Sequence, residues 1–168
     1  LIIFKLVRSM NSKIEMVEVE NYDWAVELGK KEFVDLGLSV KWANMNMGAK
    51  NSRENGLYFA WNEVKLDDEG RLPSESEMME LIEKCNWEWV SKDGKLGYNV
   101  RSRINNNEIF LPAAGLICGE KEYFVGEMGY YLTNTMKESV GACELIMSPK
   151  YYGMYLAGLY KRSVRLVK

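Results

Sequence analysis

The chain has 168 residues, with 22 basic and 24 acidic side chains and a formal net charge of −2. This near balance argues against a nucleic-acid-binding protein, which usually carries a basic excess. Hydrophobic residues make up 47% of the sequence, so a full core is expected, while no apolar run approaches the roughly 20 residues that span a bilayer, so no membrane insertion is expected.

Residues 1–32 are interpreted as an N-terminal extension whose strand or strands join the domain formed by residues 33–168. The opening stretch LIIFKLV predicts a strand, because it is short and is interrupted by Lys5. It contains no intact signal peptide. A short helix near residues 23–29, capped by Asp23, is also expected.

The segment that follows predicts a strand, a loop and a turn. Apolar residues alternate strictly from Val34 to Trp42, which is typical of a half-buried strand, with a bend or bulge at Gly37. The polar stretch 44–56 predicts a loop, and LYFAW after it returns to strand composition. The acidic run LDDEG at 66–70 is interpreted as a solvated turn, because it lacks the alternate ligand spacing of a calcium loop.

The clearest helix follows Pro73. Ser74 is a good N-cap residue, and Glu77 three positions later completes a capping box. An apolar stripe at helical spacing then comprises Met78, Leu81, Ile82 and Cys85. This stripe is interpreted as core packing and not as a ligand groove.

The rest of the chain reads as short strands. In NWEWV, Trp87 and Trp89 alternate with polar residues, so both rings should face the same side. Asp93-Gly94 predicts a hairpin turn, and the asparagines at 105–107 predict another. Further strands are expected at 115–119, 129–135, 142–148, 154–158 and 163–167. Many short strands with one clear helix predict an α+β fold with antiparallel sheets.

Several kinds of chemistry have no support in the sequence. The absence of histidine removes catalytic Ser-His and Cys-His pairs and histidine metal ligands. Cys85, Cys118 and Cys143 are widely spaced and are expected to be buried free thiols. No phosphate-binding glycine motif occurs, and no carboxylate pair stands out, although a distant pair for glycoside hydrolysis stays open. We therefore expect no metal and no cofactor.

Basic residues gather only at the end of the chain. The members of this cluster are Lys161, Arg162, Arg165 and Lys168. We interpret it as the solvated face of a strand, and it adds no expectation of a nucleic-acid partner.

A series of motifs occurs in a specific order along residues 33–167. It comprises VDLGLSVKWAN with MGA, YFAW with Glu63, RLPSESEMMELIEKCNWEW, GY.V at 97–100, IFLPAAG, GYY and SVRLV. In this order the chain resembles the major paralogous domain family of Fibrobacter and Bacteroides surface proteins. The family looks like a branch of the C-type-lectin-like fold, which it shares with formylglycine-generating enzymes and with receptor-binding proteins diversified by retroelements.

The resemblance implies small twisted antiparallel sheets with one or two packed helices, paired terminal strands and an exposed ligand face in the C-terminal half. It also favours a cell-surface or extracellular location. The chain departs from the family at Asn62, where glycine is common, and at Leu132-Thr133, where tryptophan and serines are usual. These departures lie near the presumed surface, so the choice of ligand is not transferable.

The stretch IFLPAAG, residues 109–115, receives an architectural interpretation from the resemblance and from its residues alike. Pro112 ends ladder pairing where the chain must turn. Alanine and glycine then let another backbone, or tryptophan rings, approach without a clash.

We expect a non-catalytic module that binds an unidentified glycan or protein through tyrosines, which offer rigid contact area and a hydroxyl group. Alternation puts Tyr130 and Tyr131 on opposite faces of one strand, so one of them should be buried. The candidate ligand-binding residues are Tyr131, Thr133, Asn134, Tyr151, Tyr152, Tyr155 and Tyr160.

Two alternatives stay open. An enzyme on a formylglycine-generating-like scaffold would need a copper site built from Cys118 and Cys143, and neither residue lies in a matching sequence context. We therefore expect no enzymatic activity. A purely structural adhesin domain shares all the sequence features of the binding module.

Overall fold

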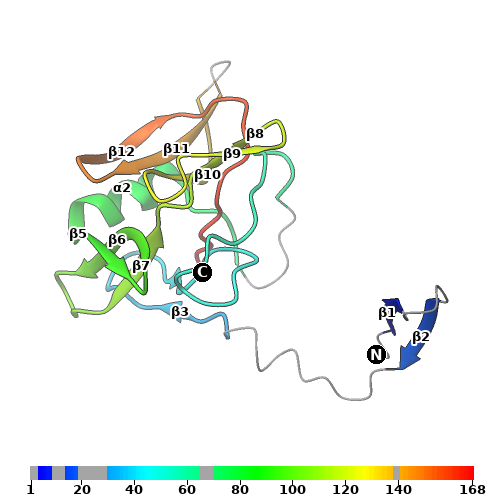
Figure 1. Cartoon of the computed structure of the whole chain (residues 1–168). Coiled ribbons are helices and arrows are strands. Elements are labelled where there is room, and N and C mark those ends of the chain that lie inside the picture. Colours follow the sequence, from blue (N-terminus) through cyan, green and yellow to red (C-terminus); the bar gives the residue numbers. More distant parts are fainter. Residues whose placement is uncertain (1–3, 9–13, 19–29, 65–69, 138–140) are drawn as a thin grey trace.

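The computed structural model describes residues 4–8, 14–18, 30–64, 70–137 and 141–168 (Figure 1). The helix expected at 23–29 lies outside the described residues, as does most of the acidic turn at 66–70. Short antiparallel pairs are formed by β1 (Phe4–Arg8) with β2 (Ile14–Glu18), β3 (Phe33–Val34) with β4 (Trp42–Ala43), and β8 (Leu116–Cys118) with β9 (Lys121–Tyr123).

Two three-stranded antiparallel sheets are the largest sheets within the described residues. The first comprises β5 (Cys85–Lys92), β6 (Lys95–Ser102) and β7 (Glu108–Pro112), in that order. The second comprises β10 (Gly129–Lys137), β11 (Gly141–Ser148) and β12 (Tyr151–Leu156). Helix α2 (Glu75–Lys84) lies between the two sheets in Figure 1. The predicted α+β class is therefore confirmed.

One hydrophobic core holds the helix and both sheets together. It joins Leu81 of α2, Val100 of β6, Leu111 of β7 and Leu145 of β11, none more than 1% exposed. Burial of such side chains contributes about 1.5–3 kcal/mol each. This core therefore determines which face of each sheet turns toward α2.

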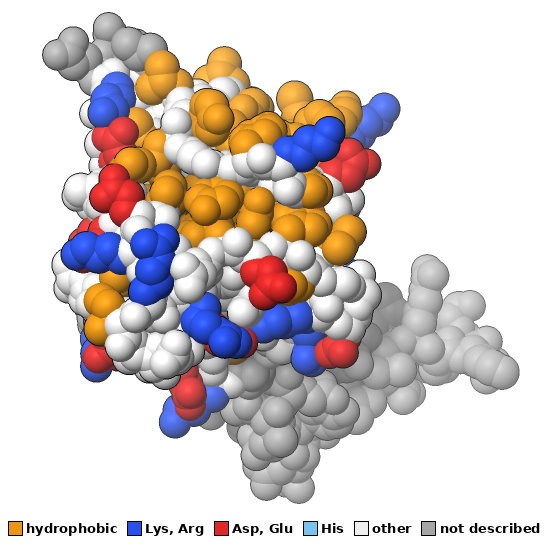
Figure 2. Space-filling model, turned by 90° about the vertical axis from the view of Figure 1, so that its left-hand side faces the viewer, with side chains coloured by type: hydrophobic (Ala, Val, Ile, Leu, Met, Phe, Trp, Pro, Cys, Tyr) orange, Lys and Arg blue, Asp and Glu red, His pale blue; other side chains and the backbone are white. Residues whose placement is uncertain are grey.

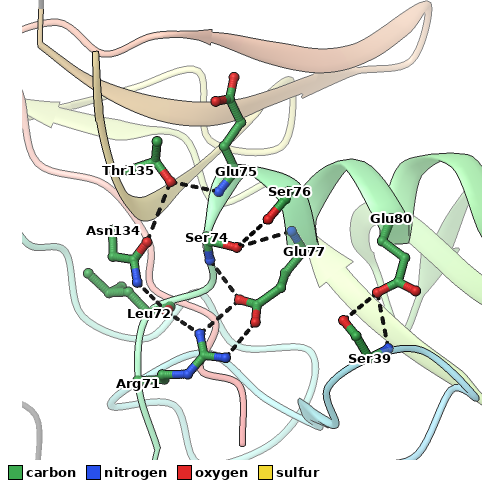
Figure 3. Close-up of polar contacts among 10 residues, drawn as sticks. All are labelled: Ser39, Arg71, Leu72, Ser74, Glu75, Ser76, Glu77, Glu80, Asn134 and Thr135. Carbon is green, nitrogen blue, oxygen red and sulfur yellow. Dashed lines mark hydrogen bonds and ion pairs between the residues drawn. The ribbon is translucent and has the colours of Figure 1, made fainter. Parts of the chain in front are cut away.

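The predicted start of α2 is confirmed in detail. The Ser74 hydroxyl accepts a hydrogen bond from the Glu77 amide (3.2 Å), and the Glu77 carboxylate accepts one from the Ser74 amide (2.8 Å) (Figure 3). Arg71 also pairs with the Glu77 carboxylate, at 2.5 and 2.8 Å. The helix ends when Cys85 adopts an extended conformation and begins β5 directly.

The long strand expected from Val34 to Trp42 is wrong. Only the two-residue strands β3 and β4 form, and the chain between them bends at Gly37, whose φ is +68°. The bend is held by side chains: the Asp35 carboxylate accepts from the Gly37 amide at 2.7 Å, and the Glu80 carboxylate accepts from the Ser39 amide at 3.0 Å. The alternating apolar residues thus reach the core from a turn, which periodicity alone does not distinguish from a strand.

The beginning and the end of residues 33–168 lie side by side. Lys41 and Lys168 exchange backbone hydrogen bonds of 2.9 and 3.0 Å. The Ala43 amide donates to the Leu166 carbonyl at 2.9 Å, and the amide of Met47 likewise donates to Val164. The last segment of the chain therefore runs through the middle of the molecule, where solvent does not reach Val164 or Leu166.

The expectation of a solvated basic face is wrong for two of its four members. Arg162 is 2% exposed and Arg165 is fully buried, whereas Lys161 is partly exposed and Lys168 exposed. Arg165 donates to the side-chain oxygen of Asn46 (3.0 Å) and to the carbonyls of Ala43 (2.9 Å) and Phe110 (2.8 Å). Burial lowers the pKa of Arg165 to about 10. These three uncharged oxygens accept hydrogen bonds from the guanidinium, which lowers the free-energy cost of burying its charge.

IFLPAAG is the point where separate parts of the chain meet, as expected. Strand β7 ends at Pro112, and Ala113 and Ala114 are buried. A Cβ atom on Gly115 would lie 2.2 Å from the carbonyl oxygen of Tyr123, so a backbone, and not a tryptophan ring, makes the close approach. The Ala114 carbonyl of the stretch accepts a hydrogen bond from the Tyr58 hydroxyl at 2.6 Å.

Candidate ligand-binding surface

Two of the candidate residues lie in the core and cannot contact an external ligand. Tyr131 and Thr133 are both 0% exposed. The Tyr131 hydroxyl donates to the Pro112 carbonyl (2.7 Å), the Thr133 hydroxyl donates to the Cys143 carbonyl (2.7 Å), and burial raises the pKa of Tyr131 to about 12. The expectation is corrected because residues 129–133 of β10 are buried on both faces of the strand. Tyr130 is also buried, at 6% exposure, so burial is not restricted to one of the two tyrosines.

Asn134 is exposed, but its polar groups bind the segment before α2. Its backbone amide donates to the Pro73 carbonyl at 2.9 Å, and its side-chain nitrogen donates to the Leu72 carbonyl at 3.4 Å. Next to it, the Thr135 hydroxyl accepts from the Glu75 amide at 2.8 Å (Figure 3). Both residues satisfy groups at the start of the helix and its approach, which leaves Asn134 a structural role.

Tyr152 belongs to an aromatic cluster that bridges the two sheets. We name Trp87, Trp89, Tyr98 and Tyr152 the aromatic seam. Tyr152 stacks on Trp87 with ring centroids 4.5 Å apart and an interplanar angle of 11°. Both tryptophans contact the ring of Tyr98 edge-on, at 5.4 and 5.0 Å, which confirms that they face the same side. The Tyr98 hydroxyl donates to the Ser148 carbonyl at 2.8 Å and ties β6 to β11.

The aromatic seam lies on an apolar part of the surface. Figure 2 shows hydrophobic side chains gathered in a broad patch on the face seen from the left of Figure 1, where α2, β5 and β12 lie. On those strands Trp87, Trp89 and Met154 are half-buried and Tyr152 is 36% exposed. Partly exposed tryptophans beside a tyrosine were not among the predicted site residues, because alternation shows which rings share a side but not whether that side is covered.

Tyr151, Tyr155 and Tyr160 lie on the opposite side of β12 from Tyr152. We name Phe124, Tyr130, Tyr151, Tyr155 and Tyr160 the outer aromatic face. Tyr151 and Tyr155 are 45% and 48% exposed, and their rings meet edge-on at 6.3 Å. Tyr130 contacts Tyr160 edge-on at 6.0 Å and Phe124 at 6.4 Å. Burial, the largest cause, and the nearby Tyr160 raise the pKa of Tyr130 to about 12.

A buried ion pair holds the outer aromatic face from below. The Arg162 guanidinium pairs with the Glu144 carboxylate of β11 and donates to the carbonyls of Gly158 and Tyr160. It also lies 4.2 Å from the centre of the Tyr160 ring, whose hydroxyl donates to Glu144 at 3.3 Å. Burial raises the pKa of Glu144, and the charge of Arg162 opposes this shift. The segment 158–162 is therefore fixed against the sheet by charge-assisted hydrogen bonds.

Phe124 is an exposed residue that the sequence analysis missed. Its φ is +59°, a conformation that is unusual for a bulky side chain and costs on the order of 1–3 kcal/mol. Its carbonyl accepts two amide hydrogen bonds, from Glu127 (3.0 Å) and Met128 (2.9 Å). Tyr123, Phe124 and Val125 are 43%, 47% and 42% exposed. The run YFV between Gly119 and Gly126 is the available signal, since adjacent apolar residues in a glycine-bounded turn are seldom accidental.

The cysteines differ from expectation at one position. All three are free, but Cys118 is exposed while Cys85 and Cys143 are buried. Cys118 ends β8, whose hairpin with β9 lies on the surface. Burial raises the pKa of Cys85 to about 11. A copper site made by Cys118 and Cys143 would have to join a surface thiol to a core thiol.

Within the described residues, no group of three or more His, Cys, Asp or Glu side chains is arranged to hold a metal ion. Of the helices in the same part of the chain, none has the length and apolar character needed to cross a bilayer. Comparisons of the chain with protein-family models, with curated proteins and with solved structures found no match.

Proposed function

We propose that the chain is a non-catalytic binding module that holds a ligand against its outer aromatic face. The observation that carries this proposal is the exposure of Tyr151 and Tyr155, close to one half each, on a sheet whose opposite face is core. Each ring offers a large contact area and a hydroxyl with few rotatable bonds to immobilise. Ligands that suit such a face are glycans and proteins that present an apolar surface.

Preorganisation supports binding over a merely structural role for these rings. Tyr155 lies opposite Glu144 in the register of β11 and β12, and Glu144 is held by Arg162. Tyr160 and Tyr130 contact each other above the same ion pair. A ligand that binds here meets rings already in position, so less conformational entropy is lost on association.

The scaffold we propose is C-type-lectin-like, as part of a bacterial cell-surface or secreted protein. It is supported by helix α2 packed against two small antiparallel sheets and by the ends of residues 33–168 lying side by side. The buried state of Cys143 and the exposed state of Cys118 give no support to a paired-cysteine enzyme on this scaffold.

The proposal is tested by presenting the chain to a glycan array and to a displayed library of random peptides. We expect binding to members of one library that falls at least ~10-fold, about 1.4 kcal/mol, in Tyr151→Ala and Tyr155→Ala and persists in the presence of a chelator. The matched control is Ile104→Ala, which removes an apolar residue that is 61% exposed in the turn after β6. Binding that survives both tyrosine substitutions would contradict the proposal.

A further inference from the structure

The β10–β11–β12 sheet has two edges, and within the described residues other segments bond to only one of them. Along β10, the Leu132 amide donates to the Ser163 carbonyl and the Ser163 amide donates to the Tyr130 carbonyl, both at 3.1 Å. Farther along, the register between β10 and β11 shifts between Leu132 and Met136. Beyond Ser163, the Asn134 amide donates to the Pro73 carbonyl at 2.9 Å, so the C-terminal segment and the approach to α2 cover the outer edge of β10.

The β12 edge has a regular register and unpaired backbone groups. Tyr151 lies opposite Ser148 across a two-residue turn, and the Ala157 amide donates to Ala142 at 2.8 Å. In an antiparallel pair the bonded positions alternate, so the amides and carbonyls of Tyr152, Met154 and Leu156 point away from β11. No backbone hydrogen bond from the described part of the chain reaches these outward groups.

Strand β12 also lacks the features that usually prevent edge-to-edge pairing. Its sequence, YYGMYL, contains no charge and no proline, and its pairing with β11 shows no bulge. Apolar side chains flank the strand on both sides: Tyr152 reaches the aromatic seam, and Tyr151 and Tyr155 belong to the outer aromatic face. The edge therefore lies within an apolar surface, as Figure 2 shows for the side that bears α2, β5 and β12.

We propose that β12 pairs in antiparallel fashion with β12 of a second copy of this chain, around a two-fold axis at Met154. In that register the outward groups of Tyr152 meet those of Leu156 in the second copy, and Met154 meets its own counterpart. The two sheets then form one continuous sheet of six strands. Such an isologous contact closes on itself and leaves no free pairing edge on β12.

Charge and size make a second copy the occupant that fits. Because β12 is uncharged, self-pairing brings no like charges together, and Lys150 comes opposite Gly158 of the second copy. Tyr155 falls opposite Gly153 and Tyr151 opposite Ala157, so each large ring on the outer side meets a small residue. A charged peptide strand would find no countercharge along β12.

This pairing has a consequence for recognition, although it does not rest on the proposed function. A two-fold axis between antiparallel strands is perpendicular to the sheet, so both outer aromatic faces lie on the same side of the joined sheet. A surface that carries several ligands would then be bound by both copies at once, with a gain in avidity.

The test is sedimentation equilibrium of the whole chain over a range of concentrations, together with amide hydrogen exchange. We expect the dimer to become populated as the protein concentration is raised to roughly 0.5 mM. The amides of Tyr152, Met154 and Leu156 should be protected from exchange only when the dimer forms. Leu156→Pro removes an outward amide that makes no bond within the chain, so we expect its thermal midpoint to be unchanged and its dimer dissociation constant to rise at least ~10-fold.

Leu156→Lys is a second variant, which places a charge opposite Tyr152 of the second copy, where no countercharge lies. It should weaken the pairing without restricting the backbone. Leu159→Ala, which alters a fully exposed residue outside β12, is the matched control and should dimerise like the unmodified chain. A chain that is monomeric at every concentration, or a dimer that persists in both Leu156 variants, would overturn the proposal.

Discussion

The two faces of the β10–β11–β12 sheet use similar residues for opposite purposes. On the inner face Tyr131 is fully buried, donates to a backbone carbonyl and packs with Leu145 in the core. On the outer face Tyr155 is 48% exposed and contacts another tyrosine. The role of a tyrosine in this sheet therefore depends on what covers its side of the sheet.

The largest expected difference between the faces concerns stability. Leu145→Ala should lower the free energy of unfolding by about 2–5 kcal/mol, because it leaves a cavity in the core that joins α2 to both sheets. Tyr155→Ala should lower it by less than about 1 kcal/mol, because the ring is half in solvent already. Urea denaturation of the two variants makes the comparison, and equal losses would contradict the assignment of the faces.

A smaller difference is expected when only a hydroxyl is removed. Tyr131→Phe should cost about 1–3 kcal/mol, since the Pro112 carbonyl and the Asn46 side chain lose a buried partner. Tyr155→Phe should leave the unfolding free energy within about 0.5 kcal/mol of the original value. Thermal denaturation of the two variants separates the contribution of buried hydrogen bonds from that of ring packing. A loss of unfolding free energy in Tyr155→Phe as large as that in Tyr131→Phe would contradict this difference between the two hydroxyls.

Phe124 should show opposite effects on stability and binding. Glycine adopts φ near +60° without strain, so Phe124→Gly should keep or raise the unfolding free energy, by up to about 1 kcal/mol. The same change removes an exposed ring that contacts Tyr130, so affinity for a ligand found by the arrays should fall. Calorimetry and binding on one preparation test this, and a marked loss of stability would show that the ring serves the fold.

The smallest expected effect comes from a charge on the other sheet. Hydrogen bonds from Asn99 and from Arg101 lower the pKa of Glu108 to about 2, from an ordinary value of 4.5. Because the folded pKa is lower, this stabilisation is present above pH 4.5 and is lost as the pH falls toward 2.

The Glu108 carboxylate is 36% exposed, so solvent screening should keep its effect below about 1 kcal/mol. We expect Glu108→Gln to reduce the loss of stability between pH 5 and pH 2.5, as measured by thermal midpoints. Identical pH profiles for the variant and the unmodified chain would show that the cluster does not stabilise the fold.

Local features were predictable where neighbouring residues decide the conformation. The capping box of Ser74 and Glu77 forms as expected, and so does the hairpin at Asp93-Gly94, where both residues have positive φ. Of the seven candidate residues, Tyr151 and Tyr155 are exposed on a common face, Tyr152 lies on the other side, and Tyr131 and Thr133 are in the core. Alternation predicts sides, but coverage by the C-terminal segment is a long-range property.

The buried arginines show the same limit. Arg162 and Arg165 were expected to be solvated because charged side chains seldom enter a core. Arg165 is buried because Ala43, Asn46 and Phe110, all distant in sequence, supply neutral acceptors, and Arg162 is buried because Glu144 of β11 supplies a countercharge. Such compensation exists only after the chain has folded.

The α+β class, the helix with its cap, the tight turns and the small-residue crossing at 113–115 could be predicted from the sequence, since each depends on propensities and on contacts between near neighbours. Long-range packing sets which tyrosines face solvent, holds Phe124 outward, buries two arginines and, within the described residues, leaves the β12 edge without a backbone partner. These outcomes depend on which distant segment covers each surface, and periodicity along the chain carries no information about that partner.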